Sequence, residues 1–253
     1  NLAHDSPAND LTDRPLVNTQ IIPTALSEAG MGLYGALFPS PLMRITYELY
    51  VVNGFHDGVV GGNADGTRIA SGKGNFEDNN NRPALVGRVA ISPALAWEVG
   101  ASLHTGAYNT WKAEDLVVDE KRGLTILAVD GAWSWKQFEV LGEYASASID
   151  VPSEVGLLAE DQSGYYFQVN AHGGENWVRA MPGSQFTAVV RYGLVDFDLN
   201  ADGDTHRRLT LGANFRPHED TVFKFDYQRN WMHDAFENQG KGAALIFGVA
   251  TYF

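Results

Sequence analysis

The sequence of 253 residues contains no cysteine and no long apolar run. Without cysteine, the chain can form neither a disulfide framework nor a zinc site with cysteine ligands. No apolar segment approaches the roughly 20 residues that a transmembrane helix requires, which excludes helical spans. A closed β-barrel is the other structure that crosses a bilayer, because its strands pair every backbone group while alternating side chains keep the mean hydropathy modest.

Basic residues are few: Lys and Arg number 18 against 31 Asp and Glu, for a formal net charge of −13. Nucleic-acid binding requires clustered Lys and Arg, so this balance argues against it. Enzyme signatures are also missing, since the sequence has no H-E-x-x-H, G-x-S-x-G, P-loop or G-x-G-x-x-G motif. The histidines do not fall at metal-ligand spacing. We therefore expect neither an enzyme nor a nucleic-acid-binding protein.

The sequence does contain a repeated alternation of apolar and polar residues. In 221–228 the apolar set is Phe223, Phe225 and Tyr227, and the polar set is Lys224, Asp226 and Gln228. Segments 43–51 and 95–104 show the same period of two. Such segments are typical of strands with one apolar and one polar face.

About eleven such strands can be counted. They are expected at 31–38, 43–53, 84–92, 95–106, 122–135, 137–148, 164–172, 185–196, 206–216, 221–232 and 242–253. Short turns alternate with long loops rich in Gly, Asn and Asp. The link 173–184 is an exception, since it stands at a short-turn position but is long enough to hold a short helix. The sequence therefore predicts an all-β fold, a transmembrane antiparallel up-and-down β-barrel with periplasmic turns and extracellular loops.

Several short motifs resemble those of one membrane-protein family. They are His4-Asp5-Ser6-Pro7, Leu11-Thr12-Asp13-Arg14-Pro15, Ile22-Pro23-Thr24, Ser27-Glu28-Ala29-Gly30, Asn53-Gly54, Arg88-Val89-Ala90-Ile91-Ser92-Pro93 and Leu211-Gly212-Ala213-Asn214-Phe215-Arg216-Pro217. Together they resemble the phosphate-selective (O and P type) porins of Gram-negative outer membranes, over most of the chain. The terminal strand that stops on Phe253 also resembles the signal read by the outer-membrane assembly machinery.

The resemblance implies that 1–253 is the carboxy-terminal part of a sixteen-stranded trimeric barrel, as a single partial domain. Segment 31–253 would be strands six to sixteen, and 1–30 would be the inward, constriction-type loop. An odd number of strands would leave an unpaired edge in lipid, so we expect about five further strands before Asn1. Because Asn1 opens a polar stretch without a signal peptide, we expect a mature, trimmed or partial chain.

Two sets of residues are expected to line the pore. The constriction set is His4, Asp5, Asp10, Asp13 and Arg14; Arg14 would meet anions and Asp13 cations, or the two would pin the loop to the barrel wall. The lumen set, read from the alternation, is Arg44, Glu48, Arg88, Glu98, His104, Asp130, Glu139, Glu143, Arg191, Arg208, Lys224 and Asp226. With Arg216 included, cations and anions balance on a polar wall. Phosphate selectivity needs converging Arg and Lys, so the visible wall does not predict it.

One acidic loop matches the first half of a calcium-binding loop. It would supply Asp198, Asn200, Asp202 and Asp204 as ligands, but Leu209 stands where the loop requires its bidentate Glu. A surface calcium site and an Asx-rich turn are therefore the two alternatives for this segment. No other cofactor is expected.

Large aromatic residues near the strand ends support a membrane location. Trp97, Trp133, Trp135, Phe138, Trp231 and Phe253 are expected to form a girdle at the headgroup level. We predict an outer-membrane homotrimeric porin, surrounded by lipid and lipopolysaccharide, for passive diffusion of small ions or hydrophilic solutes. The alternative is a non-conducting scaffold barrel that houses or anchors a partner, such as a multihaem cytochrome or a surface assembly.

Overall fold

Eleven strands form one antiparallel sheet in the computed structural model, which describes residues 8–23, 27–74, 76, 78–114, 116–153, 158–175, 177–236 and 238–252. The strands are β1 (Gly30–Ser40), β2 (Met43–Val52), β3 (Ala84–Ser92), β4 (Trp97–Ala107), β7 (Gly123–Trp135), β8 (Phe138–Ile149), β9 (Asp161–Gly173), β10 (Gln185–Asp196), β11 (Thr205–His218), β12 (Thr221–His233) and β13 (Gln239–Thr251). Each strand pairs with its neighbours in chain order, and β1 and β13 are the two edges. The predicted all-β, up-and-down antiparallel fold is confirmed, and the sheet is not closed.

The connections contain small elements that the sequence did not reveal. The loop after β2 holds α2 (Gly58–Gly61) and the 3₁₀ turn η1 (Ile69–Gly72), and the loop after β4 holds the hairpin of β5 (Lys112–Ala113) and β6 (Leu116–Val117). A further short helix, α1 (Val17–Gln20), precedes the sheet. Elements of two to four residues are too short to show a periodicity. No helix among the described residues is long and apolar enough to cross a membrane.

The link between β9 and β10 is not helical in its described residues. It consists of tight turns, in which the N–H groups of Trp177 and Met181 bond to the carbonyls of Gly174 and Val178 at 3.1 and 2.9 Å. Gly174 has a positive φ of 76°, which a right-handed helix does not admit. The described residues of this link therefore form turns in place of the short helix considered for 173–184.

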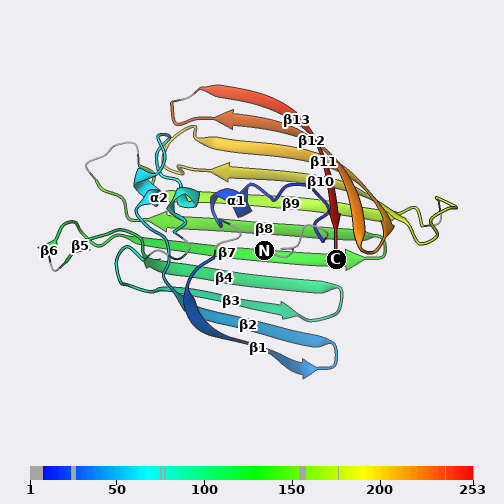
Figure 1. Cartoon of the computed structure of the whole chain (residues 1–253), viewed down its shortest axis with the longest axis horizontal. Coiled ribbons are helices and arrows are strands. Elements are labelled where there is room, and N and C mark those ends of the chain that lie inside the picture. The colour runs from blue at the N-terminus through cyan, green and yellow to red at the C-terminus, as the bar shows by residue number, and fades with distance from the viewer. Residues whose placement is uncertain are drawn as a thin grey trace.

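The sheet is curved, and α1 lies over one of its two faces (Figure 1). We call the face that α1 and segment 8–23 cover the inner face, and the opposite one the outer face. On β12, the outer-face side chains of Phe223, Phe225 and Tyr227 are 39, 48 and 38% exposed. Between them, Lys224 and Asp226 on the inner face are 2 and 0% exposed. A water-soluble sheet would place these two sets the other way round.

Aromatic side chains follow the outer face along the ends of the strands. At the short-turn ends, Trp97, Trp133, Trp135 and Phe138 stack in one row with ring centroids 5.4, 6.4 and 6.5 Å apart. A second row joins Trp177, Phe186, Phe215 and Phe223 at 5.7, 4.9 and 6.4 Å. Trp231 lies at the long-loop end of β12, and Phe253 lies outside the described residues. The outer face therefore has aromatic side chains at both of its rims.

A dry cluster lies on the inner face near the long-loop ends of β7 to β10. It consists of Leu16, Val17, Ile21, Phe55, Val59, Ile69, Tyr108, Leu124, Ile126, Ala128, Ala145, Ala147, Ile149, Tyr166, Val195 and Phe197. It joins α1 and the α2–η1 loop to the wall. The expected polar wall is thus wrong for this part of the sheet, because the segments that fold onto the inner face need apolar side chains to pack against.

Candidate functional site

Residues 10–13 lie on the inner face, and side chains from β9, β10, β11 and β12 bind them. The Asp10 carboxylate accepts a hydrogen bond from Asn170 Nδ2 at 2.7 Å. Next, Lys224 Nζ donates to the Leu11 carbonyl at 3.2 Å. The backbone N–H and the hydroxyl of Thr12 both donate to one oxygen of Asp226, the former at 2.6 Å. Each contact joins residues at least 160 positions apart, so the segment is fixed by tertiary contacts to the wall.

Asp13 joins two arginines of neighbouring strands. Arg191 on β10 bonds to one carboxylate oxygen of Asp13, and Arg208 on β11 bonds to the other. Arg191 also donates to the Asp13 carbonyl at 3.1 Å and is only 4% exposed. Asp13 therefore lies against the wall, bound to two of its arginines, and the constriction role of this residue set stays a prediction. Arg14 lines a cavity on the inner face together with Asp10 and Glu139.

The predicted lumen residues share the inner face and pair with one another. Arg88 makes two contacts with Asp130, one of them 2.8 Å long, and lies 3.7 Å from Glu98. Arg44 contacts the same Glu98 at 3.0 Å. Glu48 is exposed and lies opposite Arg88 in the β2–β3 register. The wall charges at this side of the sheet are therefore largely compensated by neighbours.

The remaining predicted residues contact segments that fold onto the wall. Glu143 accepts from Asn18 Nδ2 of α1 at 2.6 Å. The ring of His104 packs edge-on against Phe55, with centroids 4.9 Å apart. His4 and Asp5 lie outside the described residues.

Sequence reasoning missed one cluster of metal-ligand type. Oxygen and nitrogen atoms of Asp10, Glu139 and His172 all lie within 4.8 Å of one another, although the residues come from three separate segments. The Asn170 amide donates to both carboxylates, at 2.7 and 2.8 Å. A cation at this point would have to displace that amide, so hydrogen bonding already satisfies the two carboxylates.

A buried ion pair, also missed, holds the loop between β2 and β3 against the β10–β11 loop. Arg68 makes two contacts with the Asp204 carboxylate, at 2.6 and 3.0 Å, and its guanidinium carbon lies 4.1 Å from the centroid of the Phe197 ring. Gln162 Nε2 donates to the Thr67 carbonyl at 2.9 Å. The loop after β2 is therefore tied to elements that follow β8 and β10.

The ion pair of Arg68 and Asp204 also affects the calcium site predicted for the β10–β11 loop. Asp204 is committed to Arg68, and Asp198 accepts the backbone N–H of Asn200 at 3.0 Å, as in an Asx turn. A calcium site at Asp198, Asn200, Asp202 and Asp204 stays a prediction, and the ion would have to compete with Arg68.

Glu28 gives the base of the β2–β3 loop a dependence on pH. Burial raises the pKa of Glu28 from 4.5 to about 7, against a smaller lowering by the Gly54 backbone hydrogen bond. The folded state therefore holds this proton more tightly than the unfolded state, and stability should fall as pH rises from about 4.5 to 7. We expect Glu28→Gln to remove this part of the dependence, measured as the difference in unfolding midpoint between pH 5 and pH 8. The control Glu219→Gln, at an exposed position, should keep the wild-type difference between the two midpoints. A wild-type difference in Glu28→Gln as well would contradict this role of Glu28.

Comparisons with known proteins find similarity in sequence and in structure. No family model matches the chain. A protein of Aquifex aeolicus (strain VF5), described as uncharacterized, is 24% identical over 98% of this chain and 58% of that protein. An anion-selective porin from Comamonas acidovorans has a TM-score of 0.47 at 11% identity, covering 88% of this chain and 61% of that one. The chain thus spans less than two thirds of the length of either protein, and its place among the phosphate-selective porins stays a prediction.

Proposed function

We propose that the chain is part of an outer-membrane porin, through which small ions or hydrophilic solutes diffuse along a water-filled lumen. The observation that carries the proposal is the inverted alternation of β12, where aromatic residues face outward and Lys224 and Asp226 face inward. An apolar outer face that extends over many strands calls for lipid as its surroundings. The two aromatic rows at the short-turn rim fit one headgroup level, and Trp231 at the long-loop rim fits the other.

The position of segment 8–23 supports a pore with a constriction rather than a wide, unobstructed barrel. Segment 8–23 lies on the inner face, and its residues 10–13 are held by side chains of four successive strands. A loop fixed in this way narrows a lumen without moving with the solute. Selection is then set by radius and by the local field, with no covalent chemistry.

The charges on the inner face favour weak ion selectivity. Counted with segment 8–23, seven cations stand against eight anions. The cations are Arg14, Arg44, Arg88, Arg191, Arg208, Arg216 and Lys224, and the anions are Asp10, Asp13, Glu48, Glu98, Asp130, Glu139, Glu143 and Asp226. Strong anion selectivity would need an excess of cations at one point, so phosphate is not assigned as the solute.

A scaffold barrel that sheaths a second protein is the competing function. It would need an inner face free to receive the partner, whereas α1 and the α2–η1 loop pack into a dry cluster on that face.

Conductance of the full-length protein in a planar lipid bilayer tests the proposal. A porin should give stable, stepwise openings with current proportional to voltage, in potassium chloride alone. A protein that inserts but passes no current would overturn the porin and favour the scaffold. Closure in three equal steps would support the predicted trimer.

A further inference from the structure

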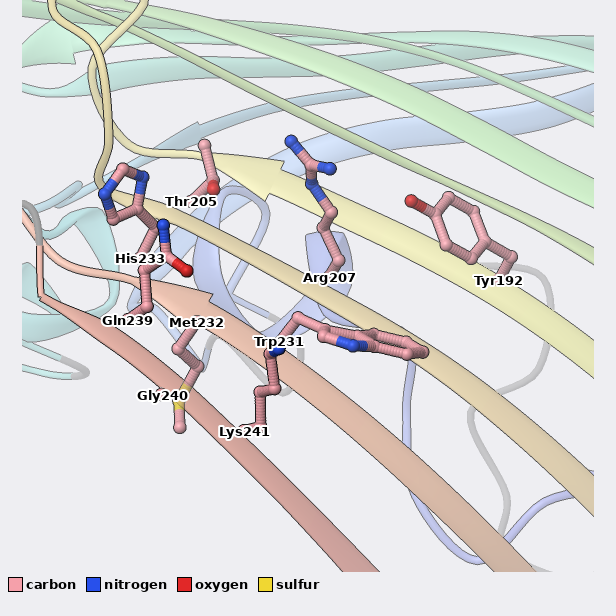
Figure 2. Close-up of a pocket in the computed structure, with 9 residues that line it drawn as sticks. All are labelled: Tyr192, Thr205, Arg207, Trp231, Met232, His233, Gln239, Gly240 and Lys241. Carbon is pink, nitrogen blue, oxygen red and sulfur yellow. The ribbon is translucent and has the colours of Figure 1, made fainter.

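A cluster of cations lies on the outer face at the long-loop rim, outside the proposed pore. The cavity there is lined by Tyr192, Thr205, Arg207, Trp231, Met232, His233, Gln239, Gly240 and Lys241. Figure 2 shows the Trp231 ring between Arg207 and Lys241, with Tyr192 beyond. None of these described lining residues is Asp or Glu, in a chain whose net charge is −13.

The β-sheet register brings these side chains together. Arg207 on β11 and Lys241 on β13 are the direct cross-strand partners of Trp231 on β12. Arg229 precedes Trp231 by two positions, so it shares the outer face, and its guanidinium carbon lies 6.0 Å from the ring centroid. We call Arg207, Arg229, Trp231 and Lys241 the rim patch. It gathers three cations around one indole.

The rim patch lacks a close counter-charge within the described residues. Arg207, Arg229 and Lys241 form no salt bridge with a described carboxylate. Asp196 on β10 acts on Arg207 by Coulomb attraction alone, and its carboxylate accepts the backbone N–H of Asp198 at 3.1 Å. Arg229 lies diagonal to both Arg207 and Lys241 in the register, and like charges that face one another across strands destabilise a sheet. An external anion would therefore stabilise this surface.

The depth of the rim patch indicates which anion it meets. Trp231 stands eight positions along β12 from Phe223 in the opposite aromatic row, or about 27 Å at about 3.4 Å per residue. A strand tilt of about 40° reduces this to about 21 Å along the membrane normal, close to the apolar height of an outer-membrane barrel. The rim patch thus lies at the headgroup level on the long-loop side, which is the level of the lipid phosphates.

We propose that the rim patch binds the phosphate of an anionic glycolipid in the leaflet on the long-loop side of the membrane. The guanidinium groups of Arg207 and Arg229 and the Lys241 ammonium bind the phosphate, and Trp231 packs its ring against the sugar and the upper acyl carbons. This rests on the proposed membrane location, because only a bilayer presents such headgroups to the outer face.

Binding of purified lipopolysaccharide to the full-length protein in detergent, followed by native mass spectrometry, tests the inference. The variant Arg207→Gln/Lys241→Gln should bind about twenty-five-fold more weakly, since each cation near a lipid surface contributes roughly a fivefold affinity. The control Lys121→Gln/Lys136→Gln also removes two cations that lie over tryptophans, at 5.7 and 4.7 Å, but away from the patch. It should bind as the wild type does.

Other probes separate the sources of the phosphate. Phosphatase-treated lipopolysaccharide should bind the wild type as weakly as intact lipopolysaccharide binds the variant, and inorganic phosphate at millimolar concentration should not compete. Equal lipopolysaccharide affinity in variant and wild type, or full competition by inorganic phosphate, would overturn the inference. So would loss of self-association in the variant with lipid binding unchanged, which would make the patch an interface between copies. Bilayer conductance tests the porin proposal separately. A protein that passes no current but still binds lipopolysaccharide through the rim patch would contradict the porin proposal and leave the lipid-binding proposal standing.

Discussion

Replacing Val17 with Asp is expected to detach α1 from the inner face. Val17 is fully buried in the dry cluster beside Ile21 and Phe55. An unpaired carboxylate at that point costs roughly 3–5 kcal/mol, which the short helix cannot offset. Hydrogen exchange should show the amide of Ile21, which bonds to the Val17 carbonyl at 3.0 Å, losing at least about a hundredfold of its protection. Single-channel conductance should rise, because residues 16–21 no longer lie on the inner face, while residues 10–13 stay bound to the wall.

Thr19→Asp provides the matched control, since Thr19 belongs to the same helix and is exposed. It adds the same charge without placing it in the dry cluster, so protection and conductance should stay near the wild-type values. Strand amides of β7 to β10 should remain protected in both variants. Unchanged Ile21 exchange in Val17→Asp would show that α1 is not held by this cluster.

Replacing Asp13 with Asn should shift the pore toward anions. The change leaves Arg191 and Arg208 without the carboxylate that both contact. A unit charge about 8 Å from a passing ion changes its energy by about 0.5 kcal/mol in water, with opposite sign for anion and cation, so the permeability ratio should change about fivefold. The reversal potential in a potassium chloride gradient measures this ratio.

The shift in selectivity has its own control. Asp220→Asn removes one negative charge from an exposed short turn, and it should leave the reversal potential unchanged. A shift of equal size in both variants would mean that net charge, rather than the position of Asp13, sets the selectivity. No shift in Asp13→Asn would place segment 8–23 away from the ion path.

The strands were predictable because the alternation of apolar and polar residues can be read within each strand by itself. The alternation in 221–228 depends only on the two faces of one strand, and the observed β12 presents those faces as expected. The pinning role of Asp13 was considered from sequence, since a loop that narrows a pore must be held by the wall. Its partners Arg191 and Arg208 were placed on the inner face by alternation alone.

Other features could not be read from the sequence, because they depend on contacts between distant segments. Arg68 and Asp204 are 136 positions apart, and no local pattern links them. The dry cluster was missed because small inward residues such as Ala145 and Ala147 look neutral in an alternating strand. The rim patch was missed because register, rather than sequence, places Arg207 beside Trp231.

The face of the sheet that meets lipid distinguishes a barrel wall from a soluble sheet, and the absence of cysteine makes this face measurable by single labels. Spin labels would be placed through Ala101→Cys and Val129→Cys on the outer face, and Ser102→Cys and Ala132→Cys on the inner face, in full-length protein in bilayers. We expect labels at 101 and 129 to relax with dissolved oxygen, and labels at 102 and 132 to relax with a water-soluble nickel chelate. The reverse pattern, or equal access of the chelate to all four positions, would contradict a barrel wall with lipid outside and water inside.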